Sequence, residues 1–218
     1  MNFCKGLYYR YTGEINKALH EFSKSKTDEN YGAKCLEQML EIYINPDNDI
    51  LLVYLDSPFD NQKYSDSSIN NNENALINYK TSELNMQAIY FLLKELKMRR
   101  NDEKTQIYEA YVTILTKQRP LINNVIGNLQ DVLKKNQENI GAWVALAMAN
   151  LVTLRINEAK TNLKIIEKSA LNMKYYNDYE RGLLLNAYIM IMSDNTKKAE
   201  EILMKLCSEV NQSQSNYL

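Results

Sequence analysis

The residues that most often bind metals or act as nucleophiles, cysteine and histidine, are few in this chain. Its cysteines are Cys4, Cys35 and Cys207, and His20 is its single histidine. A zinc site needs several such ligands at short spacing, and a cysteine nucleophile needs a histidine base beside it. Because the cysteines lie far apart and His20 has no second histidine near it, we expect neither site. His20 is predicted to be a solvated helical residue, and the cysteines to be free thiols in a reducing compartment.

Two short charged clusters are candidates for binding ions or phosphates. Asp47-Asn48-Asp49 resembles the start of a calcium loop but lacks the glycine and the closing glutamate at the required offsets. A capping or turn role explains it better. The second cluster is basic, but Asn101-Asp102-Glu103 interrupts it, so a solvated helix end explains it better than RNA binding. It consists of Lys97, Arg99, Arg100 and Lys104.

The sequence contains none of the usual catalytic motifs. There is no glycine-rich loop for phosphates, no G-x-S-x-G and no H-E-x-x-H. The methionines and aromatic residues stand at helical spacing, which is typical of a core. We therefore predict a non-enzymatic scaffold with no catalytic residues, no cofactor, no metal and no small-molecule substrate. The residues that contact its partners cannot be ranked from one sequence.

Composition favours helices with short connections. The chain has 218 residues, of which 45% are hydrophobic, but only 6 Gly and 3 Pro. β-sandwiches and propellers need many more turn formers. The net charge of −1 provides no basic field for a nucleic acid or an anionic membrane. The longest nearly apolar run, Ala142 to Leu154, is too short to span a bilayer. An intracellular, soluble all-α protein without a signal peptide is expected.

The helices that must position these residues follow a repeat. Gly6, Tyr9, Gly13, Ala18 and Phe22 stand at the offsets of a tetratricopeptide (TPR) unit. Gly6 and Ala18 are small because two antiparallel helices would cross closely there, and Tyr9 and Phe22 would fill the space on either side. Gly13 is expected in the turn, where a positive φ costs glycine nothing.

Further copies of this pattern follow along the chain. The step from Val125 to Ala159 is 34 residues, which is the TPR period, whereas the step from Ala159 to Ala199 is 40. The extra residues are expected within Asn172 to Asp178. The matching positions are Val125, Leu129 and Val132 in one copy, Trp143, Leu146, Ala147, Ala159, Leu163 and Ile166 in the next, and Leu183, Ala187, Ala199, Leu203 and Leu206 in the last.

Three more helices are predicted from apolar spacing, over Ala33 to Ile44, Leu84 to Lys97 and Glu103 to Lys117. Asp102 is expected to cap the third, and Pro120 fits the first turn of the helix after it.

The predicted fold class is therefore an all-α, TPR-type α-solenoid over residues 1–218 with about five helix-turn-helix repeats. The expected repeats span residues 1–30, 31–98, 102–136, 139–171 and 177–211. An insertion rich in Asn, Asp and Ser, residues 46–82, interrupts the second repeat. It is expected to be disordered, with the apolar run Ile50 to Leu55 docking as a strand-like piece.

Two runs are more specific than the TPR pattern. The first extends from Gly6-Leu7-Tyr8 through Ala18 to Lys24, and the second from Tyr31-Gly32 through Glu37 to Asp49. Both resemble the tetratricopeptide repeat protein 21 family, the large TPR subunit of intraflagellar transport complex A (IFT-A). Residues 142–206 resemble successive units near that family's C-terminal region. The chain departs from the family pattern at Tyr31, where a Trp is expected, and at Val125, which replaces the usual Ala of its unit.

The resemblance implies a segment of an IFT-A subunit that acts in retrograde intraflagellar transport and cilium assembly. It implies other IFT-A subunits as partners, residence in the cilium and cytoplasm, and no catalytic residues. Because family members are far longer, the chain is expected to be a fragment, a truncated gene model or a shortened paralogue.

Two other classes of function stay open. A generic TPR adaptor or co-chaperone would clamp an acidic C-terminal peptide with a Lys and an Asn, but Phe3 and Leu7 occupy those positions. A helical-repeat RNA binder would need basic residues concentrated on one face, which the near-neutral charge disfavours.

Overall fold

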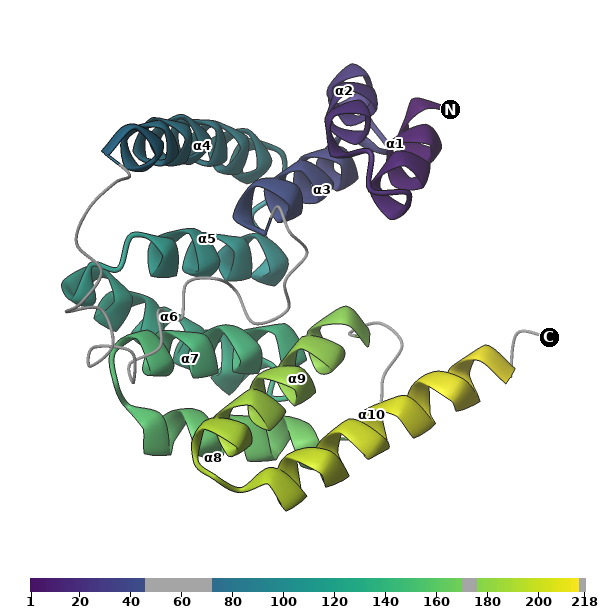
Figure 1. Cartoon of the computed structure of the whole chain (residues 1–218). Coiled ribbons are helices and arrows are strands. Elements are labelled where there is room, and N and C mark those ends of the chain that lie inside the picture. Colours follow the sequence, from purple (N-terminus) through teal and green to yellow (C-terminus); the bar gives the residue numbers. More distant parts are fainter. Residues whose placement is uncertain (46–71, 170–175, 216–218) are drawn as a thin grey trace. The chain divides into compact units, whose positions relative to one another are not determined.

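The computed structural model describes residues 1–45, 72–169 and 176–215, and this part of the chain is helical (Figure 1). It contains ten helices and no strand within those residues, which confirms the all-α prediction. The helices are α1 (Asn2–Tyr11), α2 (Ile15–Ser25), α3 (Gly32–Ile44), α4 (Asn72–Arg99), α5 (Glu103–Leu115), α6 (Arg119–Lys135), α7 (Ile140–Val152), α8 (Ile156–Lys168), α9 (Tyr176–Met192) and α10 (Thr196–Ser215).

Two helix boundaries differ most from the sequence prediction. Helix α4 begins at Asn72, well before the expected Leu84, and α5 ends at Leu115 rather than at Lys117. The prediction of disorder over residues 46–82 is therefore wrong for residues 72–82, which belong to α4. The α5 difference has a clear cause, because Lys117 has a φ of 53° and so cannot continue the helix. The cluster at 47–49, the run at 50–55 and most of the gap predicted at 172–178 lie outside the described residues.

The chain forms two units. The first contains α1 to α4 and α5 as far as Val112, and the second contains the chain from Thr113 through α10. In the first unit α1 packs on α2, α2 on α3 and α3 on α4, and in the second the helices from α6 to α10 each pack on the next, as expected of helical repeats.

In the first unit, α1 and α2 cross at the small residues that the repeat pattern predicts. Gly6 is buried, and Ala18 and Phe22 have no exposed surface. A Cβ atom on Gly6 would lie 2.5 Å from Cε1 of Phe22. Only glycine therefore lets α1 approach the Phe22 ring this closely.

In the second unit, α7 is buried almost all round, with eleven of its 13 residues buried. It packs on α6, α8 and α9. The exception near its start is Trp143, which is half-buried and donates a hydrogen bond from Nε1 to the Gln137 carbonyl oxygen at 2.9 Å. A helix that is apolar on every face belongs in the interior of a stack rather than on a surface.

The four short turns that join paired helices share one backbone geometry. Each contains a residue with positive φ, two positions before the next helix begins. The φ values are 79° at Gly13, 53° at Lys117, 65° at Leu154 and 56° at Asp194. The prediction for Gly13 is confirmed, whereas the other three turns achieve the same conformation without glycine.

The same hydrogen bonds recur around these positive-φ residues. In three of the turns the amide after the residue donates five residues back, for example from Glu14 to the Tyr9 carbonyl oxygen and from Arg155 to that of Asn150, both at 2.8 Å. In the Lys117 turn the following amide, of Gln118, donates to the Thr116 hydroxyl oxygen at 3.3 Å instead. The residue before the positive-φ residue always has a hydroxyl that donates to the preceding helix. These hydroxyl residues are Thr12, Thr116, Thr153 and Ser193. The bonds satisfy carbonyl groups that a helix end leaves open.

Replacing Leu154 by glycine is expected to raise the free energy of unfolding by about 0.5–1 kcal/mol. The left-handed conformation costs a residue with a Cβ atom about 1–2 kcal/mol, which exceeds the entropic cost of the glycine. Leu154 is 54% exposed, so little packing is lost. Urea titration followed by circular dichroism measures the change, and a destabilised variant would contradict this assignment of strain.

The caps predicted at α5 and α6 are both present. Asp102 accepts hydrogen bonds at its Oδ1 from the Thr105 amide, at 2.9 Å, and from the Thr105 hydroxyl, at 2.8 Å. Pro120 stands in the first turn of α6, as predicted. A further cap, not predicted from the sequence, stands at α7, where Asn139 Oδ1 accepts a hydrogen bond from the Ala142 amide at 3.1 Å.

The Asp102 cap is expected to make stability depend on pH. Burial alone would raise the pKa of this carboxyl, but the two bonds from Thr105 and the nearby Arg100 guanidinium lower it below its ordinary 3.8. A lowered folded-state pKa contributes stability above the unfolded pKa, and this contribution is lost as pH falls through the folded pKa. The deficit of Asp102→Asn, measured by urea titration, should therefore be larger at pH 7 than at pH 3. An equal deficit at both pH values would contradict this.

Candidate functional site

The thiols and the imidazole that could have done chemistry differ in their exposure to solvent. All three cysteines are free; Cys35 is buried, while Cys4 and Cys207 are exposed. His20 is exposed on α2, as predicted. Among the residues that the structure describes, no group of three or more His, Cys, Asp or Glu side chains is placed to hold a metal ion.

The three thiols are expected to differ sharply in reactivity. Burial first, and the Asp28 carboxylate second, raise the pKa of the Cys35 thiol to about 11, although the Arg99 guanidinium lowers it in part. Because the thiolate is the reactive form, iodoacetamide at pH 8 should alkylate Cys4 and Cys207 but not Cys35 in the folded protein. Mass spectrometry should find the third adduct only in urea. Equal labelling of Cys35 in native protein would show that α3 is open.

The basic cluster at the end of α4 is largely exposed to solvent, as the sequence predicted, but its cations are also paired with carboxylates. Lys97 pairs with Glu109 at 2.8 Å, and Arg99 pairs with Glu95 at 3.4 Å. The remaining pairs join Arg100 to Asp102 at 3.0 Å and to Glu37, and Lys104 to Glu37 at 2.6 Å. Each cation therefore has a carboxylate partner, and the glutamate partners come from three different helices. A cluster neutralised in this way does not present a field for phosphates.

Glu37 is the centre of this ion-pair network. Its side chain is 6% exposed, whereas those of Arg100 and Lys104 are 30% and 56% exposed. One turn further along α3, Glu41 accepts a hydrogen bond from the Tyr108 hydroxyl at 3.0 Å. The polar face of α3 is thus held by residues of α5 and of the segment that precedes it.

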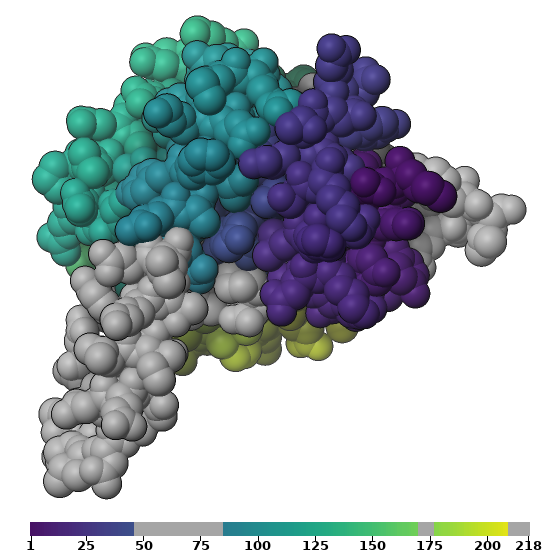
Figure 2. Space-filling model, turned by 90° about the horizontal axis from the view of Figure 1, so that it is seen from above, coloured from purple at the N-terminus to yellow at the C-terminus, as the bar shows by residue number. Residues whose placement is uncertain are grey.

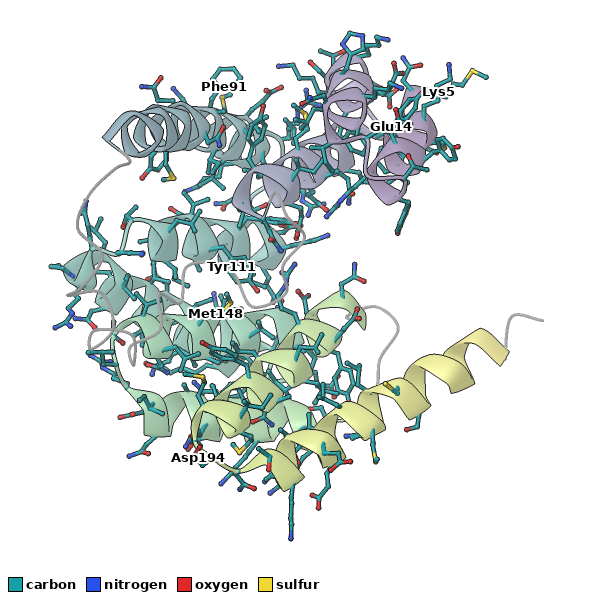
Figure 3. The ribbon with its side chains drawn as sticks, in the orientation of Figure 1. Lys5, Glu14, Phe91, Tyr111, Met148 and Asp194 are labelled. Atoms are coloured by element: carbon teal, nitrogen blue, oxygen red, sulfur yellow. The ribbon has the colours of Figure 1, made fainter. Side chains whose placement is uncertain are left out.

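A second polar contact joins α2 to α4 in the first unit. The Lys26 ammonium lies 3.5 Å from Glu95 and 5.5 Å from the centre of the exposed Phe91 ring. Figure 2 shows residues of the first three helices, in purple and blue, meeting α4 on this face. Phe91 is labelled on α4 in Figure 3. These charged side chains serve helix packing.

The structure argues against the peptide clamp of the co-chaperone alternative. The Phe3 ring stacks on Tyr31 with centroids 5.2 Å apart and contacts Phe22 at 6.0 Å. Leu7 is half-buried on the same helix. These positions pack α1 against its neighbours and offer no donor to a carboxylate.

In the second unit, three of the recurring turns lie at one edge of the helix stack. We call this surface the turn edge and define it as residues 117–122, 154–159 and 194–199, each from the positive-φ residue through the first turn of the next helix. Hydrogen bonds at or directly beside the turn edge join successive helix pairs. Arg155 Nη2 donates to Asn123 Oδ1 at 2.9 Å, and Lys160 Nζ donates to Ser193 Oγ at 2.9 Å. Figure 3 labels Asp194 at the turn between α9 and α10.

The turn edge combines exposed apolar side chains with basic ones. Leu121 is 43% exposed and Leu154 is 54% exposed, and Ile191, which flanks the third turn, is 49% exposed. The basic residues of the turn edge are Lys117, Arg119, Arg155, Lys197 and Lys198, and its acidic residues are Glu158 and Asp194. Its net charge is therefore +3, against −1 for the whole chain.

Partner-binding residues were not predicted from the sequence, and neither was this surface. The sequence does contain a signal for these turns, since a Ser or Thr stands three positions before each following helix.

None of the helices described is long and apolar enough to cross a membrane.

Comparison with known proteins shows which family of helical-repeat proteins the sequence matches. Residues 88–216 match the family model described as the tetratricopeptide repeat protein 21 C-terminal ARM domain, and residues 1–44 match the TT21 fifth ARM repeats domain. ARM repeats, like TPR units, are stacked helices. The chain is 31% identical to tetratricopeptide repeat protein 21B of Homo sapiens over 97% of its own length and 15% of that protein.

Other relatives agree over the same extent. Tetratricopeptide repeat protein 21B of Xenopus laevis is 26% identical over 97% of the chain and 16% of its own length. The Caenorhabditis elegans tetratricopeptide repeat protein 21 homolog is 24% identical over 91% of the chain and 14% of its own length. The chain thus spans about 15% of the length of these relatives. Its match to both ARM models, together with its stacked helices, shows that the chain belongs to the tetratricopeptide repeat protein 21 family.

Proposed function

We propose that this chain is a segment of an IFT-A subunit and acts as a non-catalytic scaffold in retrograde intraflagellar transport and cilium assembly. The observation that supports this most is the family match at both ends of the chain. Its partners are other IFT-A subunits, and it resides in the cilium and cytoplasm.

The arrangement of side chains supports a scaffold. A stack of helix pairs offers an extended surface to proteins rather than a closed pocket for a small molecule. The basic cluster at the end of α4 is neutralised by carboxylates such as Glu37 and Glu109, so it contributes little to nucleic-acid binding. A co-chaperone role has less support, because Phe3 is used in packing.

The boundaries of the repeats are part of this proposal. We propose helix-turn-helix units at residues 1–30, 31–98, 102–136, 139–171 and 177–211 of one solenoid. The insertion predicted in the second unit over residues 46–82 is kept only as far as the start of α4 at Asn72. The recurring turn geometry at Gly13, Lys117, Leu154 and Asp194 supports four of these units.

Affinity purification tests the cellular role. The endogenous gene is tagged in ciliated cells, the product is captured, and IFT-A subunits are identified by mass spectrometry. The proposal expects these subunits to be enriched over an untagged control. A matched strain with Gly127→Ala, at a position where a Cβ meets nothing within 4 Å, should give the same result. Capture of abundant bait without any IFT-A subunit would refute the proposal.

A further inference from the structure

The turn edge of the second unit keeps side chains in a conformation that disfavours them. Lys117, Leu154 and Asp194 all have positive φ, where glycine would be free of strain. Asp tolerates this conformation well, but Leu and Lys do not. Backbone strain that persists at exposed positions points to a role for the side chain. Leu154 is the sharpest case, because it is apolar, strained and 54% exposed.

The charges of the turn edge also oppose helix electrostatics. The N-termini of α6, α8 and α10 all lie there, and a helix N-terminus carries partial positive charge. Acidic residues usually occupy such positions, yet the first turns of α6 and α10 contain none. Arg119 and Lys197 stand there instead, and both are exposed. The cations and the helix ends therefore add to one positive field, which Glu158 and Asp194 reduce only in part.

We propose that the turn edge binds an acidic polypeptide segment that carries apolar side chains. The positive field attracts the carboxylates of the segment, and Leu121, Leu154 and Ile191 contact its apolar residues. This partner complements both features of the surface. This assignment rests on the proposed scaffold function and specifies the chemistry of one partner.

A peptide-binding experiment on the full chain tests the assignment. The probe is a fluorescein-labelled peptide of about 15 residues, glutamate with leucine at every third position, which spans about 50 Å when extended. Fluorescence anisotropy should show saturable binding that weakens as salt is raised. Peptides with lysine for glutamate, or serine for leucine, should bind at least tenfold more weakly.

Two variants locate the site. Arg119→Glu combined with Lys197→Glu should weaken binding of the glutamate–leucine peptide at least tenfold. The matched charge reversal at exposed Lys135 and Lys164, away from the turn edge, should change affinity less than twofold. Leu154→Gly should weaken binding several-fold while raising the thermal midpoint of unfolding, so its loss of binding does not come from misfolding.

The outcomes separate this proposal from its alternatives. No saturable binding, or binding that survives the reversal at Arg119 and Lys197, would overturn it. Poly(U) RNA or phosphatidylserine vesicles that bind through the same two residues, when the peptide does not, would also overturn it. If purification from cells recovers IFT-A subunits while the peptide fails, only the turn-edge assignment falls. If the peptide binds and no IFT-A subunit is recovered, the proposed cellular function falls instead.

Discussion

Replacing Phe22 by alanine is expected to lower the free energy of unfolding by about 3–5 kcal/mol, the usual cost of truncating a fully buried aromatic residue. The Phe22 ring has no exposed surface and lies against Gly6 of α1 and the Phe3 ring. Its removal leaves a cavity where α1 and α2 cross. Urea titration of the purified chain, followed by circular dichroism, measures the loss.

A double-mutant cycle with Gly6 tests whether this crossing sets the cost. In the wild-type background, Gly6→Ala places a methyl group 2.5 Å from the Phe22 ring and should destabilise by about 1–3 kcal/mol. In the Phe22→Ala background, the same methyl group enters vacated space. The double mutant should therefore lose clearly less stability than the sum of the losses of the two single mutants. Gly127→Ala is the control, since its Cβ meets nothing within 4 Å. Strict additivity would show that the two residues do not meet.

Replacing Glu37 by alanine should cost about 2–3 kcal/mol. Breaking a buried ion pair lowers stability more than breaking an exposed one, because the remaining charge is left without a partner in a site that bulk water does not reach. The loss of stability is expected to be smaller than for a fully buried pair, because the side chains of Arg100 and Lys104 are 30% and 56% exposed. The measurement is again the urea midpoint and slope of the purified chain.

An exposed pair provides the control for Glu37. Asp131 and Lys134 lie 2.8 Å apart with side chains 66% and 75% exposed. Replacing Asp131 by alanine should leave the free energy of unfolding almost unchanged, because solvent screens an exposed ion pair. If Glu37→Ala behaves like Asp131→Ala, the network around Glu37 contributes no more than a surface ion pair, and its proposed role in holding α3 is wrong.

Much of the fold could be predicted because its determinants are local. Apolar residues three and four positions apart define helices, and small residues such as Gly6 and Ala18 mark a close crossing. The Asp102 cap and the Gly13 turn depend on neighbouring residues alone, and both are confirmed. The period between Val125 and Ala159 made the stacking itself predictable.

What escaped prediction depends on long-range contacts or on strain. Glu37 and Lys104 are 67 positions apart, so no local pattern shows that the basic cluster is paired. The turn at Leu154 contradicts local propensity, because leucine disfavours the conformation that the helix ends impose. The turn edge was missed for the same reason: its members come together only when three such turns stack.

The burial of α7 also determines how the second unit can open. An amide of α7 reaches solvent only after its packing against α6, α8 and α9 is lost, so its opening approaches complete unfolding of the unit. By contrast, α10 packs on α9 and can detach with far less loss of contact. Partial opening of the second unit therefore starts at α10. It can disrupt the turn at Asp194 while the turns at Lys117 and Leu154 stay folded.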